Sequence, residues 1–214
     1  FGAFTPETGN DLFPLDGATG TAEALDINPG SAGSGPSQFT AFGGDLYFRA
    51  TTPGAGDELH RIDGATGTVE AVDVNPGPSN AAPGSLTVFG GDLYFSAFTL
   101  TTGNDLFRID GATGTVEALD VNPGVANSGP LSLTVVGDDL YFSAGTPAVG
   151  SELFRIDGAT GAVEAIDINP GVIGSNPTRL AAVGDDLYFQ AIGQGIGNEL
   201  FRLDGATGAV EAID

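Results

Sequence analysis

The chain has 214 residues, with 28 aspartates and glutamates against 6 arginines, no lysine and a formal net charge of −22. This charge excludes nucleic acid as a partner, because phosphates would be repelled, and it disfavours docking on an anionic membrane surface. Cysteine is absent, which excludes disulfides. No run of about 18 apolar residues is available to insert into a membrane. The chain begins at Phe1, lacks methionine and shows no signal peptide, so we expect a processed piece of a longer protein.

One stretch recurs along the whole chain with a fixed period. Its central leucines are 47 residues apart and are Leu12, Leu59, Leu106, Leu153 and Leu200. A period of this size indicates a repeat architecture. We expect a single repeat domain over residues 1–214. Its parts would be a partial repeat at 1–30 and full repeats at about 37–77, 84–124, 131–171 and 178–214.

Each repeat contains four expected β-strands. In the copy that begins at Ser85 they cover 85–89, 92–97, 105–109 and 115–121. Gly90-Gly91 predicts a tight hairpin with positive φ, and later copies have Gly-Asp there. A loop is expected at 98–103 and an Asp-Gly turn at 110–114. Pro123 should end the fourth strand, because proline cannot donate to a sheet ladder.

The second strand is apolar on both of its faces. Leu93 and Phe95 should point one way and Tyr94 the other. Such a sheet needs a neighbour on each side, and four-stranded antiparallel units of about 40–50 residues stacked in this way are β-propeller blades. We therefore expect an all-β β-propeller of 47-residue blades, with five blades as the leading count. The ring would be incomplete in this chain, and the rest of a longer parent chain or another subunit would complete it.

The repeat also resembles a known family. The motifs are Glu-Leu-Phe-Arg-Ile-Asp-Gly-Ala-Thr-Gly at 152–161, Asp-Ile-Asn-Pro-Gly at 167–171 and Asp-Leu-Tyr-Phe at 186–189. They are similar to the E-L-W-x-x-D-G-T repeat of secreted bacterial proteins and, more loosely, to kelch repeats. The chain departs in having Phe or His60 in place of Trp, and Ala-Thr-Gly after Asp-Gly. The resemblance implies a β-propeller outside the cell or on its surface, with the periplasm as an alternative. It supplies no catalytic residues.

The connections should alternate between the two ends of each sheet, because neighbouring strands are antiparallel. One end would carry the two nearly unvarying turns. The other would carry linkers and the variable loops 50–56, 97–103, 144–150 and 191–197. Variable loops on a rigid scaffold are where function concentrates, although relaxed drift would give the same pattern. The expected binding-face residues are Thr51, Thr52, Phe98, Leu100, Thr146, Val149, Ile192, Gln194 and Ile196.

The same end should gather oxygen ligands from two positions of the repeat. The acids before the core leucines are Asp11, Glu58, Asp105, Glu152 and Glu199. The D-x-N-P-G motif adds Asp26 with Asn28, Asp73 with Asn75, Asp120 with Asn122, and Asp167 with Asn169. Calcium prefers such ligands, but the spacing matches no calcium loop. We favour the interpretation that these side chains bind their own turns.

Other charged residues have structural interpretations. The third-strand arginines should face glutamates across the next strand, in the pairs Arg61–Glu70, Arg108–Glu117, Arg155–Glu164 and Arg202–Glu211. Pro14 takes the arginine position in the first copy and leaves Glu23 unpaired. His60, the only histidine, holds a position that is otherwise Phe, so we interpret it as a packing residue. No nucleophile has a histidine-based partner set.

The sequence favours a non-enzymatic extracellular or cell-surface scaffold or binding module with a protein or carbohydrate partner. One alternative is a lectin-like module with a sugar pocket at each blade junction, against which the loops differ and tryptophan is absent. A second is a metal-dependent propeller hydrolase or lyase, which would need acids closing on one cation. No cofactor is expected, with calcium as the exception to test.

Overall fold

The computed structural model describes residues 2–7, 9–119 and 121–213, and they form β-strands, turns and linkers. Contacts divide the chain into two compact units, one of Phe1–Leu86 with Ala97–Leu100 and the other of Thr87–Ser96 with Thr101–Asp214. Each unit is described by itself. Among the described residues there is no helix long and apolar enough to cross a membrane.

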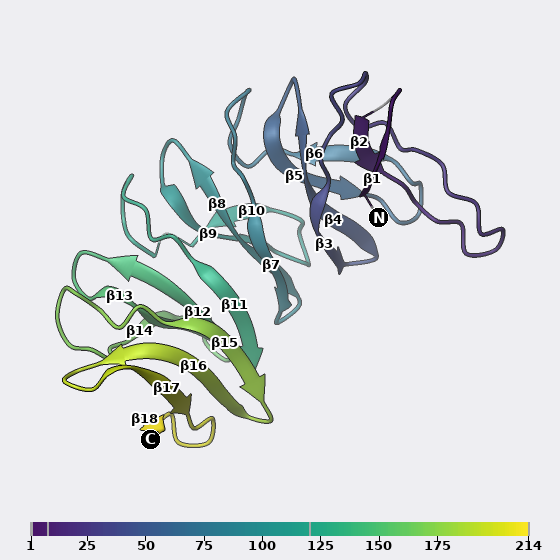
Figure 1. Ribbon diagram of the computed structural model, residues 1–214. Coiled ribbons are helices and arrows are strands. Elements are labelled where there is room, and N and C mark those ends of the chain that lie inside the picture. Colours follow the sequence, from purple (N-terminus) through teal and green to yellow (C-terminus); the bar gives the residue numbers. More distant parts are fainter. Residues whose placement is uncertain (1, 8, 120, 214) are drawn as a thin grey trace. The chain divides into compact units, whose positions relative to one another are not determined.

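The first unit contains a two-stranded and a four-stranded antiparallel sheet (Figure 1). The two-stranded sheet pairs β1 (Gly2–Thr5) with β2 (Gly9–Leu12). The four-stranded sheet is β3 (Ser37–Phe42), β4 (Asp45–Thr52), β5 (Gly56–Ile62) and β6 (Val69–Val72), in chain order.

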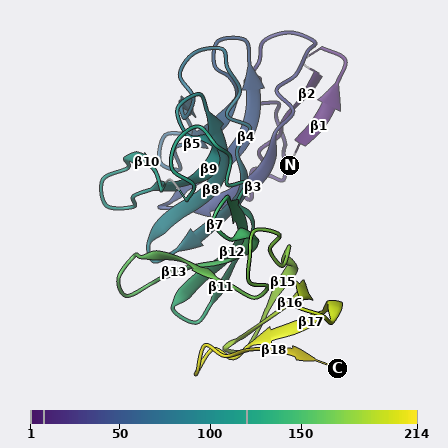
Figure 2. The ribbon, with the colours of Figure 1, turned by 90° about the vertical axis from the view of Figure 1, so that its left-hand side faces the viewer.

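Three further sheets have the same four-stranded order (Figures 1 and 2). The boundary between the units runs through the first of them, which comprises β7 (Gly84–Phe89), β8 (Asp92–Thr99), β9 (Gly103–Ile109) and β10 (Val116–Ala118). The next comprises β11 (Leu131–Val136), β12 (Asp139–Thr146), β13 (Gly150–Asp157) and β14 (Val163–Ile166). The last comprises β15 (Thr178–Val183), β16 (Asp186–Gly193), β17 (Gly197–Leu203) and β18 (Val210–Ile213). Every four-stranded sheet falls within one expected repeat.

The expected strand ends were wrong at two places. The middle strands run on into the expected loops, so that Ala144 pairs with Glu152 and Thr146 with Gly150, and only residues 147–149 are left as a turn. The fourth strand is shorter than expected and covers Val116–Ala118 where 115–121 was predicted. The physical reason is that the Val121 amide donates to the Asp105 carboxylate, at 3.0 Å, which draws the chain out of the ladder.

The tight hairpins have the expected glycines with positive φ. In the third repeat both turn residues are in this region, Gly90 at 60° and Gly91 at 90°. In the later copies positive φ is confined to the first turn residue, Gly137 at 57° and Gly184 at 61°. These two patterns correspond to type I′ and type II′ hairpins, which both suit the twist of antiparallel strands.

A bulge recurs in the first strand of the repeats and was not predicted. The register shifts between Leu131 and Thr134, and it shifts at the corresponding place in the sheets that begin at β3 and β15. One non-glycine residue per repeat has a left-handed backbone there, namely Gln38 (57°), Ser85 (56°), Ser132 (58°) and Arg179 (58°). A bulged strand bends and twists more strongly than a regular one.

The two faces of a central strand pack in different cores, as the sequence predicts. In the second unit, Leu140 and Phe142 of β12 join one buried cluster, and Tyr141 between them joins another. The first cluster includes Leu106 of β9, and the second includes Phe189 of β16. The sheet β11–β14 is therefore packed between its two neighbours, as Figure 1 also shows.

The first unit repeats this packing between the first copy and the sheet β3–β6. Leu12, Phe48 and Ala50 are buried together there, and Leu25 and Ile27 pack beside them. Leu12 is the equivalent of Leu106 and Phe48 that of Phe142, so these three described junctions use the same repeat positions.

The Asp-Gly turn is a site where a methyl group should be costly. A Cβ built on Gly158 would lie 1.8 Å from the Asp138 carbonyl oxygen, whereas one on Gly17 would meet nothing within 4 Å. We expect Gly158→Ala to lower the free energy of unfolding by about 1–3 kcal/mol and Gly17→Ala to change it by less than about 0.5 kcal/mol. Urea unfolding of both variants checks this, and equal losses would contradict the close approach.

Candidate functional site

The two ends of each sheet carry different connections. The Gly158 amide donates to the Asp139 carboxylate, at 3.0 Å, which joins the Asp-Gly turn to the adjacent hairpin. The same bond recurs at Gly64, Gly111 and Gly205. Both unvarying turns therefore share one end of each sheet, and the short 2–3 turns and linkers share the other, as predicted.

The Asp-Gly turns have one conformation, as predicted. The Asp110 carboxylate accepts hydrogen bonds from the Ala112 and Thr113 amides and from the Thr113 hydroxyl, all within 3.0 Å. The Thr113 bonds hold the pKa of Asp110 below its ordinary value. The corresponding turns at Asp63, Asp157 and Asp204 repeat these contacts. The polar groups of the Asp-Gly turns at this end of the sheets are therefore occupied by hydrogen bonds within the turns themselves.

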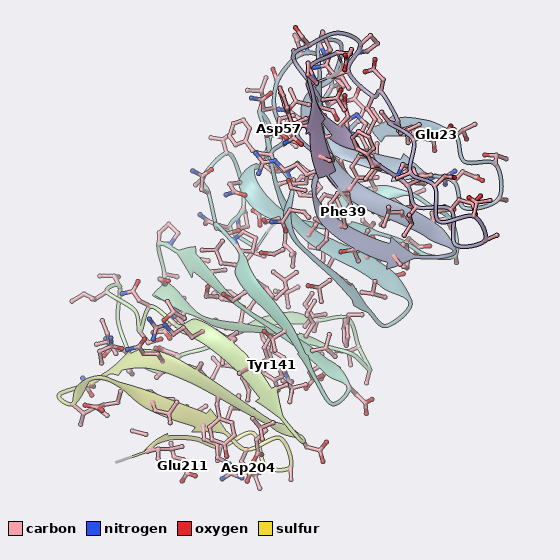
Figure 3. All side chains as sticks on the ribbon, turned by 45° about the vertical axis from the view of Figure 1, so that its right-hand side comes forward. Glu23, Phe39, Asp57, Tyr141, Asp204 and Glu211 are labelled. Carbon is pink, nitrogen blue, oxygen red and sulfur yellow. The ribbon has the colours of Figure 1, made fainter. Side chains whose placement is uncertain are left out.

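The predicted arginine–glutamate pairs are confirmed, and each arginine also binds acids that were not predicted. Arg202 lies 3.0 Å from Glu211, 2.8 Å from Asp186 and 2.8 Å from Asp204. Figure 3 labels Asp204 and Glu211 close together on this sheet. Arg61, Arg108 and Arg155 repeat the arrangement. The aspartate that begins the second strand of each repeat, such as Asp186, could have been found from the recurring Asp-Leu-Tyr-Phe motif.

The acids before the core leucines are mostly buried and bind the linker. Asp11, Glu58, Asp105 and Glu152 are each 0% exposed. Glu152 accepts hydrogen bonds from the Ile168 and Asn169 amides, both at 3.2 Å, and from the Ser175 hydroxyl. Glu199 is only half-buried. The Glu152 side chain therefore holds the backbone at the point where the chain leaves the fourth strand of the repeat.

One linker residue per repeat connects this acid to the following sheet. These clasp residues are Ser34, Ala81, Ser128 and Ser175. The Ser175 carbonyl accepts the Ile192 amide of β16 at 2.7 Å, and the Ser128 carbonyl accepts the Gly145 amide of β12 at 2.7 Å. In the first unit, Ser34 accepts from Thr51 and Ala81 from Phe98, both at 2.8 Å. The clasp residue thus spans consecutive sheets.

The asparagines of the D-x-N-P-G motif also bind their own linkers. The Asn169 side-chain amide donates to the Gly174 carbonyl at 2.9 Å, and Asn28 donates to Gly33 at 2.8 Å. Asn75 and Asn122 reach Asn80 and Asn127 in the same way. The aspartates two residues earlier, Asp26, Asp73 and Asp167, are exposed, and Asp120 lies outside the described residues.

The buried acids and the asparagines among the candidate metal ligands are therefore drawn into the protein's own turns, whereas Asp73 and Asp167 are exposed. Glu58, Asp105 and Glu152 bind backbone amides, and the amide nitrogens of the asparagines face carbonyl oxygens. Among residues 2–7, 9–119 and 121–213, no three acids or histidines are grouped so that they could hold a metal ion. These contacts agree with the turn-binding interpretation that the sequence favoured.

Glu58 differs from the other buried acids because its clasp residue is Ala81, which has no hydroxyl. It accepts the Val74 and Ala81 amides at 3.2 and 3.1 Å. Burial raises the pKa of Glu58 from 4.5 to about 7. Burial raises the pKa of Glu152 as well, but the Ser175 hydroxyl opposes this.

His60 packs as the sequence predicts. It is 2% exposed, and its ring centroid lies 5.7 Å from that of Phe48, which matches the Phe142–Phe154 separation of 5.7 Å in a later repeat. Nδ1 lies 3.1 Å from the Glu58 carbonyl oxygen and so carries the proton of the neutral ring. Nε2 has no partner among the described residues, and burial lowers the pKa of His60.

The expected binding-face residues do not all lie in loops. Thr51 and Thr52 belong to β4, Phe98 to β8, Thr146 to β12 and Ile192 to β16, because the strands are longer than predicted. The remaining four lie in turns and are Leu100, Val149, Gln194 and Ile196. Thr51, Phe98, Leu100, Gln194 and Ile196 are exposed, and the others are half-buried.

In the second unit, the most exposed apolar side chains at this end come from linkers. Val172 is 73% exposed and Ile173 80%, and Val125 occupies the corresponding place one repeat earlier. Sequence reasoning missed all three. The signal was the residue after Pro-Gly, which is Ser31 and Pro78 in early copies and valine in the later ones.

The hydroxyl-free clasp of Glu58 predicts an unusual pH dependence. The folded state takes up the Glu58 proton more readily than the unfolded state, so its contribution to the free energy of unfolding falls as pH rises from 4.5 to about 7. Ala81→Ser should add a donor to the carboxylate, stabilise the protein by about 1 kcal/mol at pH 8 and make this fall shallower.

Urea unfolding at several pH values between 5 and 8 measures this effect. Ser175→Ala is the matched reverse change at Glu152 and should destabilise the protein most at high pH. If Glu58→Gln left the pH dependence of the free energy of unfolding as it is in the wild type, the assignment of this dependence to Glu58 would be contradicted.

Replacement of the buried histidine should stabilise the fold. We expect His60→Phe to raise the free energy of unfolding by about 0.5–2 kcal/mol, because it restores the residue of the other repeats and removes an unpartnered nitrogen. The gain should grow as pH falls below 6.5, because the unfolded histidine takes up a proton more readily than the buried one. Thermal unfolding at pH 5 and 8 checks it, and a loss of stability would show that the ring nitrogen is needed.

No protein-family profile and no curated protein matches the sequence. Solved structures do match. TolB from Acinetobacter baumannii aligns with a TM-score of 0.52 and 15% identity over 97% of this chain and 49% of TolB. A Mycobacterium tuberculosis puromycin-hydrolyzing peptidase gives 0.54 and 16% over 93% and 31%. A prolyl endopeptidase gives 0.56 and 14% over 95% and 32%. This chain therefore spans half or less of each of these proteins, and identities this low show the fold alone.

The fold is the predicted one: all-β, with four-stranded antiparallel sheets that match the blades of β-propeller domains.

Proposed function

We propose that this chain is a non-enzymatic binding module that holds a protein partner through exposed apolar residues at the variable end of its blades. The observation that carries the proposal is the pair Val172 and Ile173, which are 73% and 80% exposed. Large apolar side chains grouped in solvent at one end of a scaffold are typical of interaction sites.

The loop that presents this pair is held firmly. Gly174 forms a parallel bridge with Ser151 of β13, its carbonyl accepts the Asn169 side chain, and Ser175 donates to the buried Glu152. A Cβ on Gly150 would lie 2.6 Å from the Val172 carbonyl oxygen, so the loop lies directly on the strand. Such a loop loses little conformational entropy on binding, which favours affinity.

The other end of the blades is a poorer candidate. Its Asp-Gly turns share one conformation, and the carboxylates at this end are occupied by backbone amides, threonines and arginines. The burial of His60 among aromatic side chains favours binding over acid–base catalysis. The net charge of −22 and the resemblance to secreted repeat proteins support an extracellular or cell-surface setting.

The double substitution Val172→Ser with Ile173→Ser tests the proposal. We expect it to weaken partner binding at least tenfold and to leave the thermal unfolding temperature within about 2 °C of wild type, because both side chains are exposed. Immobilised wild type and variant are incubated with surface and secreted proteins of the source organism. A retained protein is then purified and its Kd is measured against both.

Val135→Ser is the control, because Val135 is also an exposed valine of the second unit but lies beside the unvarying Gly137 turn. It should retain the partner fully. Equal retention by the double variant would overturn the proposed surface, and retention of a glycan in place of a protein would replace the partner class.

A further inference from the structure

The buried acids before the core leucines differ in how fully their two oxygens are bound. In the glutamate copies both oxygens accept hydrogen bonds from the linker. Glu152 receives the Asn169 amide on Oε1 and the Ile168 amide on Oε2, both at 3.2 Å. Glu58 likewise receives one linker amide on each oxygen, at 3.1 and 3.2 Å. A buried glutamate therefore reaches linker donors with both of its oxygens.

Asp105, the aspartate copy in the second unit, is bound through one oxygen. Its Oδ1 atom accepts the Leu106 amide at 2.8 Å, the Val121 amide at 3.0 Å and the Ser128 hydroxyl at 2.6 Å. Its Oδ2 atom is buried and has no hydrogen-bond partner among the described residues. The side chain is 0% exposed, so bulk solvent does not satisfy this oxygen either.

Asp11, the aspartate copy in the first unit, repeats this one-sided binding. Its Oδ1 atom accepts the Ser34 amide at 3.0 Å and the Ser34 hydroxyl at 2.8 Å. Its Oδ2 atom is buried and without a partner in the part of the chain that the structure describes. The same oxygen is thus unpartnered in both aspartate copies, and the two glutamate copies show no such atom. The difference follows the residue type, because aspartate is shorter by one methylene group.

The linker amide that a longer side chain would reach is the other half of the site. Glu152 binds the Asn169 amide through Oε1, and the equivalent residue in the third repeat is Asn122. Within the described residues, the amides that reach Asp105 are those of Leu106 and Val121 alone. Asn122 is 7% exposed, so its amide lies in the same buried region.

The chemistry of these two groups selects the ligand. Oδ2 needs a hydrogen-bond donor, and the asparagine N–H needs an acceptor. A cation cannot accept a hydrogen bond, and no three acids or histidines of residues 2–7, 9–119 and 121–213 are grouped to hold a metal ion. Water both donates and accepts, and buried polar atoms without a protein partner are commonly satisfied by ordered water. A water molecule, with a share of liquid volume of about 30 Å³, is also similar in size to a methylene group.

We propose that Asp105 and Asp11 each hold one internal water molecule between the carboxylate and the linker. The water donates to Oδ2 and accepts the N–H of Asn122 in the third repeat and of Asn28 in the first. A hydrated aspartate thus makes through water the contact that Glu152 makes directly, which explains how both acids serve at one position of the repeat.

A room-temperature crystal structure that resolves ordered water tests the two sites directly. We expect one water within about 3.2 Å of Oδ2 in Asp105 and in Asp11, and none at the corresponding place beside Glu152. Oxygen-17 relaxation dispersion of the water signal counts the long-lived internal waters in solution and checks that the sites are occupied outside a crystal.

Two matched substitutions change the number of sites. Asp105→Glu recreates the glutamate–serine pair of the fourth repeat, so it should fold as wild type does and lower the count by one water, while the water at Asp11 stays as the internal control. Glu152→Asp is the reverse change and should raise the count by one. Circular dichroism spectra show that both variants are folded.

The wild-type structure decides the proposal even if a variant folds poorly. It would be overturned by the lack of a water at Oδ2 of Asp105, or by a metal ion there with several oxygen ligands at about 2.4 Å. A water that persists in Asp105→Glu, or an unchanged count in folded Glu152→Asp, would overturn the exchange of a methylene group for water.

Discussion

The buried carboxylate before the core leucine, present in four of the five copies, is the interaction on which the repeat depends. Glu152 is fully buried, and it is tolerated because linker amides and the Ser175 hydroxyl satisfy it. The same linker residue accepts the Ile192 amide of the next blade. One buried acid therefore ends the fourth strand, shapes the linker and positions the following sheet, so its loss would cost far more than one surface hydrogen bond.

This dependence explains why the two ends of each blade differ. At the unvarying end, the turn conformation is set by local bonds to the carboxylates of Asp110 and its equivalents, and replacement of the aspartate would remove them. At the variable end, Glu152 and Asn169 bind backbone groups of the linker, Glu152 at its start and Asn169 near its end. The side chains between these two points are not needed to hold the linker in place. Val172 and Ile173 are such residues, which is why this end can carry recognition.

Departures from the repeat show how strictly its positions are used. His60 stacks as phenylalanine does, but its Nε2 atom has no partner among the described residues. Ala81 leaves the Glu58 carboxylate without the hydroxyl that Ser175 supplies to Glu152. Pro14 leaves Glu23 without an arginine, and Leu15 beside it is exposed.

The sequence by itself determined the period, the four strands of each blade, the turn chemistry and the Arg–Glu register, because all of these depend on side chains close together in the chain or on simple alternation. Only the tertiary structure decided where the strands end, because that depends on the Asp105 carboxylate, which binds an amide 16 residues away. It also decided that Asp11, Glu58, Asp105 and Glu152 serve the linker, which burial in a packed core requires. Finally, it decided the exposure of Val172 and Leu200. Leu200 has the same residue type and motif as Leu153, and only the presence of a neighbouring sheet distinguishes them.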